Sequence, residues 1–169
     1  DWSSDVCSSD LPDEIPNTYY TLEWANDNRT LYYTVLDEAL RPYKVFRHTL
    51  GVAEDALVYH ETDERFTLGI ARTRSQRYLF IGIDSPLTSE VLYLDADNPT
   101  GDFRPILPRV QGNEYTVTHH TDTFFIRTNE NAPGYRIVET PVANPSRDNC
   151  REVIPAREGV TIELETCFE

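Results

Sequence analysis

Residues 66–109 read FTLGIARTRSQRYLFIGIDSPLTSEVLYLDADNPTGDFRPILPR and contain four short runs in which apolar and polar residues alternate. The runs are FTLGIAR, RYLFIGI, SEVLYLD and FRPIL, and each is too short for a helix of useful length. The joints between them, TRSQ, DSPLT and ADNPTGD, are rich in Ser, Asp, Asn, Pro and Gly, which favour tight reversals of the chain. This pattern predicts one four-stranded antiparallel sheet.

The same pattern recurs on both sides of this stretch. The first strands align as YTLEW from Tyr20, FTLGI from Phe66 and YTVTH from Tyr115. The second strands then align as TLYYTV, RYLFIGI and TFFIRT, and YKVFRHT, ALVYHE, YRIVETP and CREVIP supply the later strands of the outer copies. A period of roughly 45 to 50 residues with four strands in each period is typical of propeller blades.

The sequence therefore predicts an all-β fold, a partial β-propeller within residues 12–169. Three four-stranded antiparallel blades are expected at about 19–61, 66–109 and 114–156, and the first strand of a fourth is expected from Val160. A blade cannot bury both of its faces alone, and an open row of blades leaves two unpaired ends. We therefore expect the sequence to be a fragment of a longer protein.

Residues 1–11, DWSSDVCSSDL, have no periodicity and a Ser/Asp composition that does not continue downstream. They resemble an in-frame translation of a sequencing-library adapter oligonucleotide. The alternative is a genuine disordered polar tail. In either case the segment is excluded from the fold prediction, as a tag would be.

Composition narrows the classes of partner. The net charge is −14, with 15 basic and 29 acidic residues, which argues against nucleic acid because phosphate binding needs clustered Lys and Arg. An acidic field attracts cations, so a peptide that carries Arg or Lys is a sensible ligand, although acidic surfaces also serve solubility. The sequence has no apolar run of about 18 residues, and we expect no membrane contact.

Cysteine usage and the absence of a leader-like segment bear on location. Cys7, Cys150 and Cys167 have no Cys-x-x-Cys spacing and no paired framework, which suits a reducing compartment. No segment combines a charged start with an apolar middle, as a secretory signal does. The expected location is the cytoplasm.

Four histidines are candidate metal ligands or bases. His119 and His120 are adjacent, so in a strand they point to opposite faces and cannot both bind one metal. His48 and His60 each lie alone in a predicted strand. Zinc needs further His or Cys ligands at fixed spacing, so a structural role is expected for all four, with no metal and no cofactor.

Four carboxylates are candidates for paired acid–base chemistry, as in propellers that cleave sugars: Asp27, Asp95, Asp97 and Glu64. All four lie in or beside predicted turns, where Asp is expected for backbone reasons. No glycine begins a Gly-x-Ser-x-Gly elbow, so no nucleophilic triad can be assembled. The sequence therefore predicts no catalytic residues, and its substrate-binding residues are left unassigned.

Several short pieces together resemble a known family. They are WANDNRTLYY from Trp24, YKVFRH from Tyr43, DERF from Asp63, SEVLYLD from Ser89, NEY from Asn113, FIRTN from Phe125 and PSR from Pro145. In combination they resemble the propeller of the prolyl oligopeptidase family of serine peptidases, most closely its oligopeptidase B branch. The similarity spans nearly all of residues 19–155.

The resemblance implies a parent enzyme in which a seven-bladed propeller caps a C-terminal α/β-hydrolase domain. That domain would supply the catalytic Ser, Asp and His, and the propeller would restrict access to short peptides, with cleavage after Arg or Lys. None of the family's catalytic residues can be placed on this sequence. The alternatives are a free-standing propeller that serves as a protein-binding platform, which shows no repeated Trp-Asp signature, and a glycosidase propeller.

Overall fold

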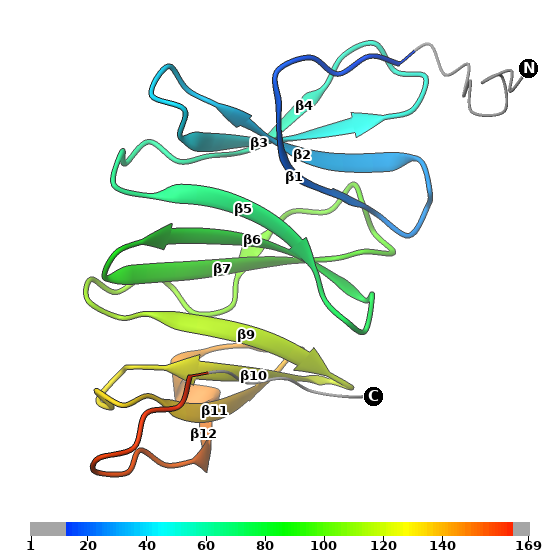
Figure 1. Ribbon diagram of the computed structural model, residues 1–169. Coiled ribbons are helices and arrows are strands. Elements are labelled where there is room, and N and C mark those ends of the chain that lie inside the picture. Colours follow the sequence, from blue (N-terminus) through cyan, green and yellow to red (C-terminus); the bar gives the residue numbers. More distant parts are fainter. Residues whose placement is uncertain (1–12, 164–169) are drawn as a thin grey trace, which may run out of the picture.

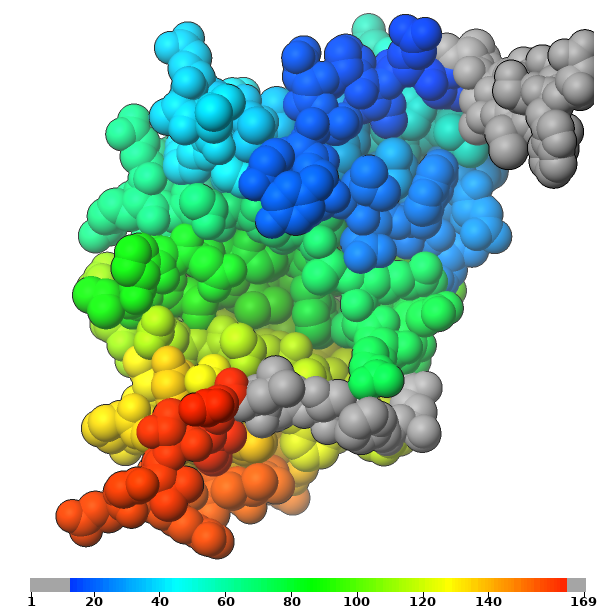
Figure 2. All heavy atoms as spheres, viewed as in Figure 1, coloured from blue at the N-terminus to red at the C-terminus, as the bar shows by residue number. Residues whose placement is uncertain are grey.

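The computed structural model describes residues 13–163, which form three four-stranded antiparallel sheets and one short 3₁₀ helix, η1 (Arg147–Asn149). In each sheet the strands are hydrogen-bonded in the order in which they occur in the sequence. The three sheets follow one another through the molecule in chain order (Figures 1 and 2). This architecture confirms the prediction of an all-β, partial propeller fold.

The strand bounds are as follows. The first sheet contains β1 (Thr18–Trp24), β2 (Thr30–Leu36), β3 (Pro42–Thr49) and β4 (Ala56–His60). The second contains β5 (Thr67–Arg72), β6 (Tyr78–Ser85), β7 (Thr88–Asp95) and β8 (Arg104–Pro105). The third contains β9 (Tyr115–His120), β10 (Thr123–Thr128), β11 (Arg136–Pro141) and β12 (Arg151–Ile154).

The first hairpin of each sheet uses a residue with left-handed backbone. Asn28, Gln76 and Thr121 have φ values of 54°, 58° and 53° at corresponding positions of the three sheets. Asn tolerates this conformation well, whereas the β-branched Thr121 adopts it at a steric cost. The turn geometry is thus repeated even where the residue type is not.

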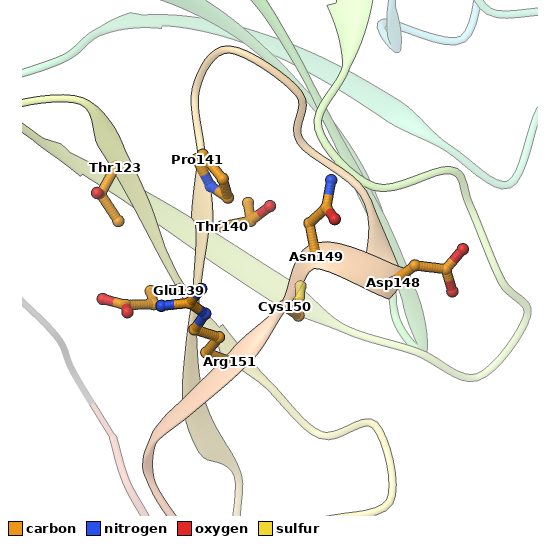
Figure 3. A pocket seen from close by; sticks show the side chains of 8 residues that line it. All are labelled: Thr123, Glu139, Thr140, Pro141, Asp148, Asn149, Cys150 and Arg151. Atoms are coloured by element: carbon orange, nitrogen blue, oxygen red, sulfur yellow. The ribbon is translucent and has the colours of Figure 1, made fainter.

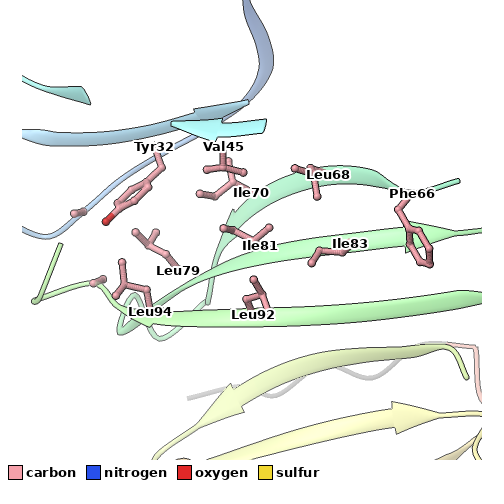
Figure 4. Close-up of a cluster of buried hydrophobic side chains, with 12 residues drawn as sticks. Tyr32, Val45, Phe66, Leu68, Ile70, Leu79, Ile81, Ile83, Leu92 and Leu94 are labelled. Atoms are coloured by element: carbon pink, nitrogen blue, oxygen red, sulfur yellow. The ribbon is translucent and has the colours of Figure 1, made fainter. Parts of the chain in front are cut away.

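The first core lies between sheets one and two and is built by strand alternation (Figure 4). Along β6, Leu79, Ile81 and Ile83 face sheet one, where Tyr32 and Val45 meet them. All five side chains are fully buried. Because both faces of β6 are covered, its sequence is apolar at nearly every position rather than at every second one.

The second core lies between sheets two and three. Tyr78 and Phe80, on the opposite face of β6, meet Phe124 of β10 at ring-centroid distances of 5.6 and 5.9 Å, and Tyr93 of β7 meets it at 5.1 Å. All three pairs have edge-to-face geometry, which is favourable for aromatic rings. Sheet two is therefore the shared central layer of the described structure.

Two predicted strands differ in the structure. The run FRPIL yields only the two-residue strand β8, because Pro105 has no N–H to donate and Ile106 and Leu107 turn into the second core. Residues 160–163 form no strand: the N–H of Ile162 donates instead to the carbonyl of Gly134, at 2.9 Å. The rest of that expected strand lies outside the described residues, as do residues 1–11, Cys7 and Cys167.

Within residues 13–163, no helix has the length and apolar character needed to cross a membrane.

Candidate functional site

The histidines lie in separate structural settings. Within blade one, His48 places Nδ1 2.7 Å from an Asp55 oxygen, and its Nε2 lies 3.4 Å from Asp13. His60 packs edge-on against Tyr43 in the same sheet. Among the residues that the structure describes, no three His, Cys, Asp or Glu side chains gather as a metal site would require.

The adjacent histidines of β9, His119 and His120, also lie in different settings. His119 is buried between sheets two and three, with Nδ1 2.7 Å from Ser75 Oγ and its ring packed against Tyr78 and Phe124. The neighbouring His120 is only partly buried. His119 therefore joins two blades, and this contact places it at a boundary between sheets.

Three of the four candidate carboxylates organise turns at one end of sheets one and two. The Oδ1 atom of Asp95 accepts from the N–H of Asp97, at 2.9 Å, and Asp97 Oδ1 accepts from the Asn26 side chain, at 2.7 Å. Asp27 accepts from the backbone of its own hairpin. Glu64 is exposed in the linker between β4 and β5. The four do not form the facing pair that glycoside hydrolysis needs.

The role of Asp27 in capping the turn between β1 and β2 can be tested directly. Its Oδ1 accepts from the N–H groups of Arg29 and Thr30 at 3.0 and 2.9 Å, and Oδ2 accepts from Thr30 Oγ1 at 2.7 Å. Burial opposes ionisation, but these hydrogen bonds outweigh it and lower the pKa of Asp27. We expect Asp27→Ala to cost about 1 kcal/mol in urea unfolding, whereas Asp27→Asn, which keeps one acceptor oxygen, costs less. Equal losses in the two variants would contradict the capping role.

A cavity of about 410 Å³ on sheet three has a lining that includes a thiol, an acid and a base (Figure 3). Cys150 Sγ donates to the carbonyl of Ser146 at 3.3 Å, and burial, followed by the nearby Glu130, raises the pKa of the thiol. Glu139 of β11 and Arg151 of β12 lie opposite each other in the strand register. A thiol with a raised pKa is a poor nucleophile at neutral pH, so this cavity does not have the chemistry of a cysteine active site.

An ionic cluster joins the linkers of blades one and two. Arg109 donates to Glu61 at 2.5 Å through Nη2 and to Glu90 at 3.1 Å through Nε, and its guanidinium lies 3.9 Å from the Phe66 ring centroid. Glu61 is only 5% exposed. Burial opposes its ionisation, but the hydrogen bonds from Arg109 and from the N–H of Asp63 outweigh burial and lower the pKa of Glu61. The cluster therefore holds two sheets together.

The first strand of each sheet forms the edge most relevant to a ligand. Sheets one and two meet through β5, which contacts β1, β2 and β3, and sheets two and three meet through β9, which contacts β7. Each sheet thus meets the preceding one through its own first strand, β1, β5 and β9 follow one another along the stack (Figure 1), and we assign this edge to the side that faces the axis of a ring of blades. These three strands carry a single carboxylate, that of Glu23.

A second cavity, of about 280 Å³, opens on this edge between β5 and β9. Its lining includes Arg72, Arg74 and His119 together with the apolar side chains of Phe80 and Val117. Apart from His119, these residues were not singled out from the sequence. Only the repeat itself points to them, because it places the ends of successive first strands side by side.

Comparison with known proteins agrees with this architecture. Residues 5–169 match the family model "Prolyl oligopeptidase, N-terminal beta-propeller domain". The chain is 36% identical over 163 residues to dipeptidyl aminopeptidase BI of Pseudoxanthomonas mexicana, covering 94% of this chain and 22% of that protein. It is 35% identical to Protease 2 of Moraxella lacunata, covering 78% of this chain and 20% of that protein.

A solved structure shows the same fold. The chain superposes on oligopeptidase B from Leishmania major with a TM-score of 0.82 and 30% identity, covering 91% of this chain and 22% of the other. Stacked four-stranded sheets without a catalytic constellation among the described residues define the class, a segment of a β-propeller. The chain belongs to the prolyl oligopeptidase family, within its N-terminal propeller domain. It spans about a fifth of the length of the relatives named here.

Proposed function

We propose that this chain is the non-catalytic propeller portion of a serine oligopeptidase that hydrolyses short peptides after Arg or Lys. The propeller acts as a size-selective gate over a separate hydrolase domain. The observation that carries the proposal is the match to the family's propeller domain over almost the whole chain. A closed ring of such stacked sheets would admit an extended peptide along its axis but exclude a folded protein.

The preference for basic peptides has an electrostatic basis in this proposal. The chain carries a net charge of −14, which favours the approach of cations. Because the first strands contribute only Glu23, the attraction arises mainly from carboxylates in the turns at both ends of the blades and less from the channel wall. The absence of a Cys-x-x-Cys spacing or paired framework in the sequence agrees with a cytoplasmic location for the parent enzyme.

The size-selective gate and the electrostatic attraction of basic peptides can be tested together in the intact protein. We expect hydrolysis of Arg-containing peptides to fall several-fold in kcat/KM between low and high salt, because screening shortens the reach of the field. A matched peptide with Gln in place of Arg should respond less, and a folded protein that contains the same sequence should not be cleaved. If hydrolysis of the Arg peptide does not weaken as salt is added, the proposed electrostatic attraction of basic peptides is contradicted.

The gene itself offers a separate test of the enzyme assignment. Reading the DNA downstream of this segment should reveal an α/β-hydrolase domain with a Gly-x-Ser-x-Gly elbow and the Asp and His of a triad. A reading frame that closes after the propeller would instead support the protein-binding platform.

A further inference from the structure

His48 is a buried imidazole that faces a carboxylate on each side. It lies near the end of β3 and is 5% exposed. Its Nδ1 is 2.7 Å from Asp55 Oδ1, and its Nε2 is 3.4 Å from Asp13 Oδ1. The two carboxylates come from different segments, since Asp55 lies in the loop between β3 and β4 and Asp13 lies in the segment that leads into β1. His48 therefore connects two separate parts of blade one.

The other groups around this imidazole carry no charge at neutral pH. Tyr33 of β2 donates its hydroxyl to Asp55 Oδ2, and burial, followed by this hydrogen bond, raises the pKa of Tyr33. The residue opposite His48 on β2 is Leu31. Within residues 13–163, His48 forms ion pairs with Asp13 and Asp55 and with no other group. The imidazole is therefore the one group at this point that can neutralise the two carboxylates.

The two contacts of His48 are both favourable only when the ring is protonated. A neutral imidazole carries one N–H, whereas the protonated ring carries two. The contact with Asp55 is a hydrogen bond, but Nε2 has no hydrogen-bond partner among the described residues and meets Asp13 through charge alone. When the ring loses a proton to solvent, the N–H that stays on Nδ1 keeps the bond to Asp55, and the lone pair of Nε2 then faces the carboxylate of Asp13. The attraction between His48 and Asp13 thus becomes a repulsion.

The entry segment, residues 13–17, is attached to sheet one through Asp13. Besides its contact with His48, Asp13 Oδ1 accepts from the N–H of Gly51, at 3.1 Å, and the chain before β1 runs beside the loop between β3 and β4 (Figure 1). The register of β1 with β2 shifts between Thr18 and Leu22, so the first half of β1 has an irregular ladder. β1 is also the strand of sheet one that we assign to the channel edge. The attachment of Asp13 therefore affects how firmly this part of the channel wall is held.

We propose that the entry segment is a pH-sensitive strap, held on sheet one by protonated His48 and released when the imidazole loses its proton. An imidazole ordinarily changes its charge between pH 5 and 8, and carboxylates ordinarily stay ionised throughout that range. The strap is therefore closed at the acidic end of the range and open at the alkaline end. Opening frees the first half of β1, so the rigidity of this part of the channel wall falls as the pH rises. This device does not depend on whether the parent protein hydrolyses peptides.

Hydrogen exchange of the intact protein that contains this propeller tests the strap. Mass spectrometry follows exchange in peptides that cover residues 13–20, near pH 5.5 and near pH 8.5, and each rate is divided by the intrinsic rate at that pH. We expect the corrected exchange of these residues to be at least about 5-fold faster at the higher pH, the effect of losing one charged contact. Strand β6, which is buried between sheets one and three, is the internal reference and should not change. A native protein without this pH difference would overturn the proposal.

Two variants assign the pH difference to the contact between His48 and Asp13. His48→Gln can still donate to Asp55 but carries no charge, and Asp13→Asn removes the charge from the entry segment while leaving the bond between His48 and Asp55. Each variant should show the same corrected exchange of residues 13–20 at both pH values. His60→Gln is the matched control, because His60 is an exposed histidine of β4 in the same sheet, and it should retain the native difference.

Asp13→Asn decides the outcome if the buried His48→Gln substitution prevents folding, because Asp13 lies outside the strands of sheet one. A pH difference in residues 13–20 that persists in Asp13→Asn would show that another contact holds the entry segment and would overturn the proposal.

Discussion

Replacing Arg109 by Met is expected to lower the free energy of unfolding by about 3 kcal/mol, the lower end of the range for breaking a buried ion pair. Met retains an unbranched stem that can pack on Phe66 but leaves Glu61, which is 5% exposed, without its closest cation. Arg109→Lys keeps the charge but loses the fork that reaches both carboxylates, so its loss should be intermediate. Urea unfolding followed by far-UV circular dichroism measures all three proteins.

The pH dependence of that loss provides an internal check. The pKa of Glu61 is lowered from its ordinary value of 4.5, so the stability it contributes is present above that value and is lost as the pH falls through the folded pKa. The native protein and Arg109→Met should therefore differ most near neutral pH and converge in acid.

Adding Glu61→Gln to Arg109→Met removes the uncompensated charge and should restore part of the stability at neutral pH. A difference between the native protein and Arg109→Met that stays constant from neutral pH into acid would show that packing, rather than charge, accounts for the effect.

Phe124→Ala is expected to be the most disruptive single change in the core, with a loss of about 3–5 kcal/mol. The ring is fully buried and meets Tyr78, Phe80 and Tyr93 of sheet two edge-on. Because blades are stabilised by their neighbours, the loss should fall mainly on sheet three. Hydrogen exchange should therefore accelerate in β9–β12 more than in β1–β4.

Phe125→Ala is the matched control for that prediction. Phe125 is the next residue of β10, points to the opposite face of the sheet and is only partly buried. Its loss should be clearly smaller than that of Phe124→Ala. Uniform acceleration of exchange across all three sheets in Phe124→Ala would contradict the idea that each blade depends mainly on its neighbours.

The fold could be predicted because the sequence pattern that indicates it occurs in each of the three blades. Each blade repeats the same alternation and the same turn chemistry, and sheet two shows the consequence most clearly, since β6 buries Leu79 on one face and Phe80 on the other. The truncation of β8 could also have been anticipated, because Pro105 cannot donate to the ladder. The missing strand at 160–163 could not, because its hydrogen bond to Gly134 depends on the position of a distant turn.

The candidate cavity and the ionic cluster were not found from the sequence because each is made by residues on different blades. Glu61 and Arg109 are 48 residues apart, and Ser75 and His119 are 44 apart. The first separation lies within the repeat period of roughly 45 to 50 residues, and the second is one residue shorter than its lower bound. Opposite charges or polar partners spaced by one period would therefore have been a usable signal, although the orientation of Arg72 towards a cavity would not follow from spacing alone.

That spacing has a consequence for how the protein is made. Contacts between blades, such as Asn26 with Arg72 and Arg77 with Thr121, join residues only 46 and 44 positions apart. At a synthesis rate of about 5–20 residues per second, each repeat leaves the ribosome within seconds of the one before it. Each later blade can then contact the preceding one soon after both have left the ribosome, so contacts between neighbouring blades can form while translation continues.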